Sequence, residues 1–262
     1  MHKPYCWAPW VNLQHGNVMG GNTPCCEWNG DIHKGSIKDY INSEHLQKIK
    51  KNMLKHKGYR KSCQVCRKNE RVGNLSRRIL LHQDEHVQDL IDSWKDKDIL
   101  QPGLSYILYL DYRPSNLCNL KCRTCGYKNS SMIAKEQGIE LEISVPVKDY
   151  KNLDMSKLKK VMVVGGEPSI QQDLYDFLDY CCDLGLNNTL DLSFTTNATN
   201  TNKTWMDKLS KWENLRVEIS LDGIGPTMEY IRHGASWATI EKNCAVYEEV
   251  LGKDKIEKGV LI

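Results

Sequence analysis

The chain has 262 residues, of which 40% are hydrophobic and 26% are charged, and this composition predicts a folded globular protein. The net charge of +3 is too small to indicate a nucleic-acid partner, no apolar stretch reaches the roughly 18 residues that cross a bilayer, and nothing resembles a signal peptide. We therefore expect a cytoplasmic protein without a membrane or nucleic-acid partner, whose eleven cysteines serve metal or redox chemistry instead of disulfides.

The N-terminal part of the chain favours irregular structure with two helices. It holds five of the cysteines, which are Cys6, Cys25, Cys26, Cys63 and Cys66. Ser43 can cap a first helix whose apolar residues run from 46 to 54 and which Gly58 would end. A second amphipathic helix is predicted over 87–94.

A polar segment over 95–103 separates this N-terminal part from the rest of the chain. It ends in Pro102-Gly103, a pair that is typical of turns and linkers. We therefore expect a small irregular and helical cysteine-rich domain over 1–100 and a second domain over 104–262.

The second domain alternates between strand and helix patterns. Strands are predicted at 106–112, 161–164, 190–195, 215–221 and 259–262. Helices are predicted at 169–184, around Trp205 to Trp212, and at 237–251. This order predicts an α/β fold with a parallel sheet, whose functional residues lie at the carboxyl ends of the strands. The chain stops as the fifth strand begins, which leaves an open edge on the predicted sheet. We therefore expect the chain to be a fragment of a longer protein, or the missing side of the sheet to be supplied in another way.

Three cysteines with the spacing CxxxCxxC follow the first of these strands: Cys118, Cys122 and Cys125. A [4Fe–4S] cluster held by only three cysteines leaves one iron open, and an open position on a metal is usually where chemistry occurs. The alternative is a zinc site or an inert iron–sulfur centre that takes a fourth ligand such as His82 or Cys63.

Three further motifs stand at predicted strand ends. They are Gly165-Gly166-Glu167-Pro168, Thr195-Thr196-Asn197 and Ser220-Leu221-Asp222-Gly223. Each is a weak signal alone, but together with the cysteine triplet they point to one site on a βα scaffold.

With these four motifs, the chain from about Leu104 to Ile262 resembles the radical S-adenosylmethionine (SAM) superfamily. The resemblance implies a partial (βα)6 barrel, here apparently truncated after the start of strand 5. It implies that the triplet ligates three irons of a [4Fe–4S] cluster and that the fourth iron takes the amino and carboxylate groups of SAM. The implied cofactor-binding residues are Gly165, Gly166, Glu167, Asn197, Ser220 and Arg232. Thr124 stands where the family usually has an aromatic or large apolar residue.

The resemblance also implies the chemistry. SAM would be cleaved reductively to methionine and a 5′-deoxyadenosyl radical that abstracts hydrogen from a substrate, with electrons from a donor such as flavodoxin or ferredoxin. The expected substrate is a peptide or protein side chain. The alternatives are a nucleotide-derived small molecule, or a non-catalytic iron–sulfur or zinc module that only binds a partner.

The cysteines of the first quarter resemble the SPASM and twitch auxiliary modules of the same superfamily, in the order found in phage-type twitch proteins. The resemblance implies a second iron–sulfur cluster held by Cys6, Cys25, Cys63 and Cys66. Cys25 is preferred over Cys26 because it follows a proline, as in those modules. Four thiolates also suit tetrahedral zinc, which remains the alternative.

A run of basic residues surrounds the first predicted helix: Lys48, Lys50, Lys51, Lys55, Lys57, Arg60 and Lys61. It is the one hint of an RNA or acidic-peptide partner, against the plainer interpretation of a solvated helix face. Three later cysteines lie on apolar helix stripes and are expected to be buried as small hydrophobes: Cys181, Cys182 and Cys244.

Overall fold

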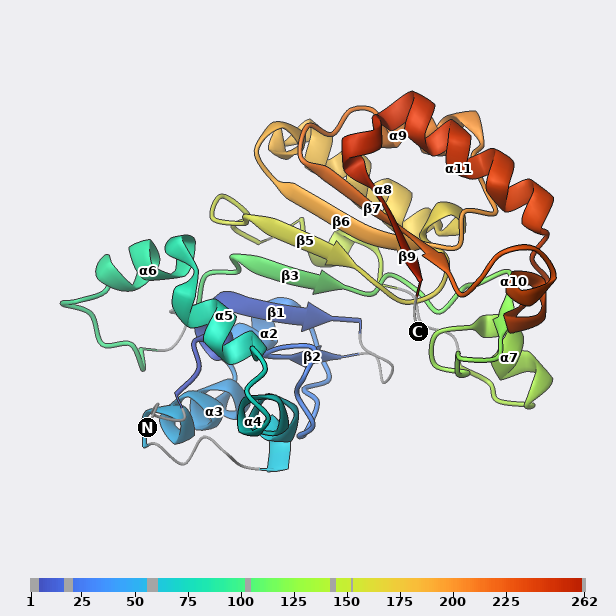
Figure 1. The fold of residues 1–262 in the computed structure, drawn as a ribbon. Helices are drawn as coiled ribbons and strands as arrows, with labels where there is room; N and C mark the ends of the chain where they lie inside the picture. Colours follow the sequence, from blue (N-terminus) through green and yellow to red (C-terminus); the bar gives the residue numbers. More distant parts are fainter. Residues whose placement is uncertain are drawn as a thin grey trace. The chain divides into compact units, whose positions relative to one another are not determined.

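The computed structural model describes residues 5–16, 21–55, 61–101, 105–141, 145–151 and 153–260. The chain divides into two compact units (Figure 1). The N-terminal unit comprises Met1–Asp111 and Asn152–Leu158, and the C-terminal unit comprises Tyr112–Lys151 and Lys159–Ile262. Within the described ranges, no helix is both long enough and apolar enough to cross a membrane.

The N-terminal unit contains more regular structure than the sequence predicts. Its elements are α1 (Ala8–Val11), β1 (Asn12–His15), β2 (Asn22–Thr23), α2 (Ile37–Asn42), α3 (Glu44–Leu54), a 3-10 turn (Lys61–Cys63), α4 (Gln64–Arg71), α5 (Arg77–Gln83), α6 (Glu85–Asp92) and most of β3 (Tyr109–Tyr112). The strands lie in the order β2-β1-β3. The expectation of an irregular and helical domain therefore missed a short sheet, because two- and four-residue strands are too short to show a period of two.

The predicted start of α3 is confirmed. The hydroxyl of Ser43 accepts a hydrogen bond from the backbone N–H of Leu46 at 3.1 Å, as expected of a helix cap. The helix ends at Leu54, and the predicted stop at Gly58 lies outside the described residues. One member of the basic run departs from a solvated face, because Lys50 is buried with its ammonium 2.8 Å from the Ser105 hydroxyl.

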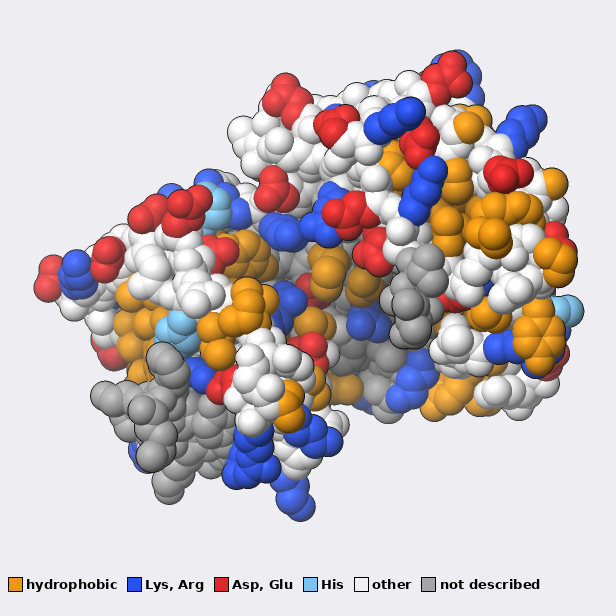
Figure 2. All heavy atoms as spheres, viewed as in Figure 1, with side chains coloured by type: hydrophobic (Ala, Val, Ile, Leu, Met, Phe, Trp, Pro, Cys, Tyr) orange, Lys and Arg blue, Asp and Glu red, His pale blue; other side chains and the backbone are white. Residues whose placement is uncertain are grey.

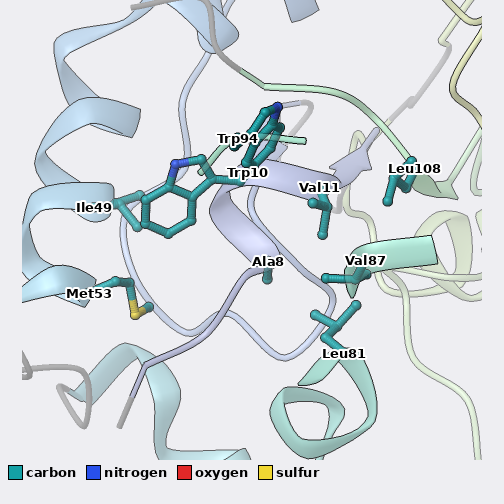
Figure 3. Packing of buried hydrophobic residues seen from close by; sticks show 9 residues of the cluster. All are labelled: Ala8, Trp10, Val11, Ile49, Met53, Leu81, Val87, Trp94 and Leu108. Carbon is teal, nitrogen blue, oxygen red and sulfur yellow. The ribbon is translucent and has the colours of Figure 1, made fainter. Parts of the chain in front are cut away.

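The core of the N-terminal unit gathers side chains from four helices. Figure 3 shows its buried members, which are Ala8, Trp10, Val11, Ile49, Met53, Leu81, Val87, Trp94 and Leu108. The indole N–H of Trp10 donates to the carbonyl of Ile99 at 2.7 Å, so this large side chain is buried with its polar atom satisfied. Outside this core, basic side chains gather on the surface around α4 (Figure 2), where Arg67, Lys68 and Arg71 are exposed.

The C-terminal unit is the α/β domain that the sequence predicts. Its regular elements are β4 (Lys121–Cys122), α7 (Ser131–Glu136), β5 (Lys160–Val163), α8 (Gln172–Asp183), β6 (Asp191–Thr196), α9 (Lys203–Leu209), β7 (Leu215–Leu221), α10 (Gly225–Ile231), β8 (Arg232–His233), α11 (Trp237–Leu251) and β9 (Ile256–Val260), with 3-10 turns at Val147–Asp149, Pro168–Ile170, Leu186–Asn188 and Lys253–Lys255. Strands β5, β6, β7 and β9 are parallel neighbours in that order. The end of β3 adjoins β5, where the N–H of Val164 donates to the carbonyl of Tyr112 at 3.0 Å.

Several elements differ from their predicted bounds. Helix α8 begins at Gln172 instead of 169, because Pro168–Ile170 form a 3-10 turn first. Strand β9 begins at Ile256, before the predicted 259. The antiparallel ribbon of β4 and β8 and the helix α10 were not predicted. A two-residue strand carries no periodic signal, and Gly225-Pro226 at the start of α10 is a pair typical of turns.

Helices α8, α9 and α11 cover one face of the parallel sheet (Figure 1). A buried hydrogen-bond relay joins the last two: the indole N–H of Trp205 donates to the Tyr247 hydroxyl at 2.8 Å, and that hydroxyl donates to the Asn200 carbonyl at 3.2 Å. Both rings are fully buried, so the Trp205 N–H depends on the Tyr247 hydroxyl for its partner.

The substitution Tyr247→Phe should therefore destabilise the protein by about 1–3 kcal/mol, because it leaves the buried Trp205 N–H and the Asn200 carbonyl without this partner. Urea unfolding followed by tryptophan fluorescence measures the change. Tyr180→Phe, at a partly exposed position on α8, is the control and should change stability by less than about 0.5 kcal/mol. Equal unfolding midpoints for the two variants would contradict the relay's contribution.

Candidate functional site

A cavity of about 360 Å³ opens at the carboxyl ends of β5, β6 and β7 in the C-terminal unit. Its lining includes all nine residues that the sequence predicts for this unit, namely Cys118, Cys122, Cys125, Gly165, Gly166, Glu167, Asn197, Ser220 and Arg232. The parallel topology explains the convergence, since the carboxyl ends of parallel strands meet at one edge of the sheet. The structure therefore brings the four sequence motifs into one site.

The cysteine loop that carries the triplet follows β3 and is fastened to α10. The N–H of Arg123 donates to the Ile231 carbonyl at 2.8 Å, and its guanidinium lies 4.1 Å from the centre of the Tyr230 ring. Burial raises the pKa of the Cys118 thiol to about 11 and also raises that of Cys122. Such thiols stay protonated at neutral pH until a metal displaces the proton.

Gly165 and Gly166 follow β5 and lie directly against the backbone that leads into the cysteine loop. The N–H of Gly166 donates to the Ser115 carbonyl at 3.0 Å, and the N–H of Glu167 donates to the Leu117 carbonyl at 2.8 Å. A Cβ on Gly166 would lie 2.0 Å from the Leu117 oxygen, and Gly165 has a φ of +128°. No other residue type fits this approach. The glycines are thus needed to hold the cysteine loop, whatever further contact they make with a ligand.

Glu167 is buried where it lines the cavity, and one of its two carboxylate oxygens accepts most of its hydrogen bonds. Oε1 accepts hydrogen bonds from the Ser169 N–H at 3.1 Å, the Ser169 hydroxyl at 2.7 Å and the Thr196 hydroxyl at 2.6 Å. Oε2 accepts one, from the N–H of Asn197 at 2.8 Å. Burial raises the pKa of Glu167, and these hydrogen bonds act against the rise by stabilising the ionised form.

Asn197 closes a ring of three hydrogen bonds that the sequence did not reveal. The Asn119 amide donates to the Thr199 hydroxyl at 2.8 Å, this hydroxyl donates to the Asn197 Oδ1 at 2.7 Å, and the Asn197 amide donates to the Asn119 Oδ1 at 2.9 Å. In the turn between Asn197 and Thr199, Ala198 has a φ of +55°. Because Asn119 lies inside the cysteine loop, the ring joins that loop to the end of β6.

Ser220 and Arg232 also line the cavity. Ser220 lies near the end of β7, and Arg232 faces Cys122 across the β4–β8 ribbon. The Nε of Arg232 lies 2.9 Å from the Asp222 carboxylate, and its Nη1 lies 4.0 Å from the Cys122 Sγ. Arg232, predicted to meet a cofactor carboxylate, thus already has an internal carboxylate as its partner.

A second group of cysteines lies in the N-terminal unit. Cys6, Cys25, Cys63 and Cys66 line one small pocket there. Cys26 is not part of that lining, and burial, together with the negative charge of Asp111, raises the pKa of its thiol to about 11. Asp111 is paired with Arg77 at 3.2 Å. The structure thus groups the four cysteines that the sequence selected and leaves Cys26 outside the lining of their pocket.

Arg78 lines the same pocket and is paired with Glu70 through short contacts. Burial raises the pKa of Cys6 to about 12 and that of Cys63 to about 11, while the positive charge of Arg78 acts in the opposite direction on both. In the described part of the chain, no three His, Cys, Asp or Glu side chains are arranged to hold a single metal ion. His82 was named above as an alternative fourth ligand for the cysteine triplet of the other unit. In the structure its Nε2 contacts the Tyr5 carbonyl at 2.9 Å.

Comparison with known families agrees with this geometry. The model of the radical SAM superfamily matches residues 112–254, which is more than half of the 262 residues. The chain belongs to the radical SAM superfamily, as its strand-end motifs predicted. No curated protein matches it in sequence.

Solved structures that match the chain include SuiB of Streptococcus suis. SuiB bound to S-adenosylmethionine is 19% identical with a TM-score of 0.45, and the match covers 85% of this chain and 49% of SuiB. SuiB bound to its precursor peptide SuiA is 19% identical with a TM-score of 0.44 and the same coverage. Native anSMEcpe with AdoMet and the Cp18Cys peptide is 18% identical, with a TM-score of 0.39 and coverage of 57% and 41%. The chain spans about half the length of SuiB.

The substitution Gly166→Ala should destabilise the metal-free protein by about 3 kcal/mol or more, because the added Cβ would collide with a backbone oxygen that cannot move without breaking its own hydrogen bond. Urea unfolding measures the change. Gly126→Ala is the matched control, since a Cβ there meets nothing within 4 Å. Similar stability of both variants would show that the cysteine loop is not held by this contact.

Proposed function

We propose that the chain is a radical SAM enzyme whose catalytic centre is the cavity of the C-terminal unit. Membership of the superfamily implies a [4Fe–4S] cluster and SAM. When bound, this pair supplies reductive cleavage of SAM to methionine and a radical that abstracts hydrogen from a substrate. The observation that carries the proposal is the lining of one cavity by the cysteine triplet, the Gly165-Gly166-Glu167 motif and Ser220.

The donor set of the cavity suits these groups. Cys118, Cys122 and Cys125 are soft ligands for iron and leave one coordination position open. The Oε2 of Glu167 accepts a single protein hydrogen bond, so it retains capacity for an ammonium donor such as the amino group of SAM. The amide of Asn197 uses one of its two N–H groups in the ring with Asn119, so the other is left for a ligand. Thr124 lines the same cavity without the aromatic face that would stack on adenine.

With its cluster assembled, the anaerobically reduced full-length protein should convert SAM to methionine and 5′-deoxyadenosine, which liquid chromatography with mass spectrometry detects. Glu167→Gln should weaken SAM binding by about tenfold or more, because the charge that faces the ammonium is lost and the new amide N–H₂ must face existing donors.

Glu136→Gln, at an exposed residue on α7, is the control and should bind and cleave SAM normally. SAM binding without any 5′-deoxyadenosine, in protein with its full content of iron and sulfide, would refute the enzyme and favour a non-catalytic binding module.

For the N-terminal unit, we propose an auxiliary iron–sulfur cluster in a SPASM- or twitch-like module held by Cys6, Cys25, Cys63 and Cys66. The shared pocket and the adjacent cation of Arg78 support a set of thiolates at this place. Tetrahedral zinc is the alternative occupant of four thiolates.

A variant with Cys118, Cys122 and Cys125 all changed to Ala should retain iron and sulfide, and additional Cys6→Ala should remove most of both. Metal analysis and the electronic absorption spectrum measure this. Cys26→Ala is the matched control and should keep the metal content unchanged, because Cys26 is not part of the pocket lining. Zinc without iron or sulfide in the triple variant would establish the zinc site instead.

For the substrate, we propose a peptide or protein side chain, with a nucleotide-derived small molecule as the second candidate. The proposal rests on the resemblance of the N-terminal cysteines to auxiliary modules that commonly serve peptide modification. A reductant such as flavodoxin or ferredoxin would supply the electron.

A further inference from the structure

The charged side chains that line the catalytic cavity, among the described residues, are Arg113, Glu167 and Arg232. Two of these have partners within the protein. Arg232 is paired with Asp222 at 2.9 Å, and both side chains are nearly inaccessible to water. The carboxylate of Glu167 accepts four hydrogen bonds from its neighbours.

Arg113 is the exception. Its Nη1 has only a long contact of 3.5 Å with the Asn129 Oδ1. Its buried Nε makes no hydrogen bond, which is also true of the Arg232 Nε, but the Arg232 Nε lies in an ion pair. In the part of the chain that the structure describes, no carboxylate forms an ion pair with it. A guanidinium always carries its charge and offers five donors in a planar fork, so an unmatched one inside a cavity is costly to keep.

The place of Arg113 in the sheet separates it from the cofactor's expected position. Arg113 directly follows β3, whereas Ser220 is the second-last residue of β7, and the strand order β3-β5-β6-β7 puts three spacings between these two strands. At about 4.8 Å per spacing this is about 14 Å along the sheet. The proposed amino-group site at Gly165 to Glu167 is nearer, and a cation there would be repelled by Arg113. Because the amino and carboxylate groups of SAM stand on one carbon atom, the carboxylate would lie beside that cation, in a place where the charge of Arg113 is disfavoured.

We propose that Arg113 is the receptor for an oxyanion of the substrate, either a carboxylate or a phosphate, on the β3 side of the cavity. The guanidinium fork can bind two oxygens of either group at once, which would fix the substrate's orientation as well as its position. That the oxyanion belongs to a substrate rests on the proposed function. That Arg113 binds an oxyanion rests on the cavity and its unmatched charge alone.

The test uses the full-length protein with its iron–sulfur centres and the probes sodium phosphate and sodium acetate, each compared with sodium chloride at equal ionic strength. A ligand that binds only the folded state raises the melting temperature, by about 3–5 °C at ten times its Kd for a chain of this size. The wild type should show this rise with phosphate, acetate or both. Arg113→Met should lose it and should melt no lower than the wild type in chloride, because an unmatched charge has been removed.

The matched control is Arg216→Met, which removes an exposed arginine paired with Glu257 on the edge of the same sheet and should keep the rise. A rise with phosphate alone identifies a phosphate receptor, and one with acetate alone identifies a carboxylate receptor. An equal rise in the wild type and Arg113→Met, or no rise in the wild type, would overturn the proposal.

A further arm separates substrate from cofactor. SAM should bind Arg113→Met as tightly as the wild type. If the variant binds SAM tenfold more weakly but binds decarboxylated SAM normally, Arg113 holds the cofactor's carboxylate and the substrate assignment is wrong. If the wild type cleaves no SAM yet shows the Arg113-dependent rise, the proposed function fails and the oxyanion receptor stands.

Discussion

The close approach of Gly165 and Gly166 to the backbone of Ser115 to Leu117 is the contact on which the rest of the site depends. It joins the end of β5 to the segment that leads directly into the first cysteine of the triplet, through two backbone hydrogen bonds and with no room for a Cβ. The position of the cysteine loop is therefore set by main-chain geometry. The side chains of the site adjust the geometry that these main-chain contacts establish.

Two further contacts extend the same constraint along the sheet. At the end of β6, the ring of Asn119, Thr199 and Asn197 holds the middle of the cysteine loop, and the N–H of Asn197 also donates to Glu167. Beyond β7, the β4–β8 ribbon holds the second cysteine opposite Arg232. The loop is thus attached after each of three successive strands. A site built on several rigid elements keeps its geometry before any ligand binds, so little ordering cost is left for the binding step.

The sequence predicts those parts of the site that follow from the order of strands, helices and motifs along the chain. Strand and helix periods place the motifs at carboxyl ends, and parallel topology then requires them to meet, so the lining of the cavity by Glu167 and Ser220 follows from the sequence. The ring does not, because Asn119 and Thr199 are far apart in the chain and their polar side chains suit any exposed turn. The ion pair of Arg232 with Asp222 also needed the structure, because a motif names a residue's type but not its partner.

Two arginines near the cysteines share one electrostatic arrangement, and Arg113 departs from it. Arg232 lies beside Cys122 and is paired with Asp222, and Arg78 lies beside Cys6 and is paired with Glu70. In both places a cation stands close to thiols while a carboxylate of the protein neutralises it, which limits the cost of burying charge before a metal is bound. Arg113 faces its cavity with no such carboxylate. Because Arg113 is half-buried in the cavity and has no carboxylate partner among the described residues, its counter-charge is best sought in a ligand.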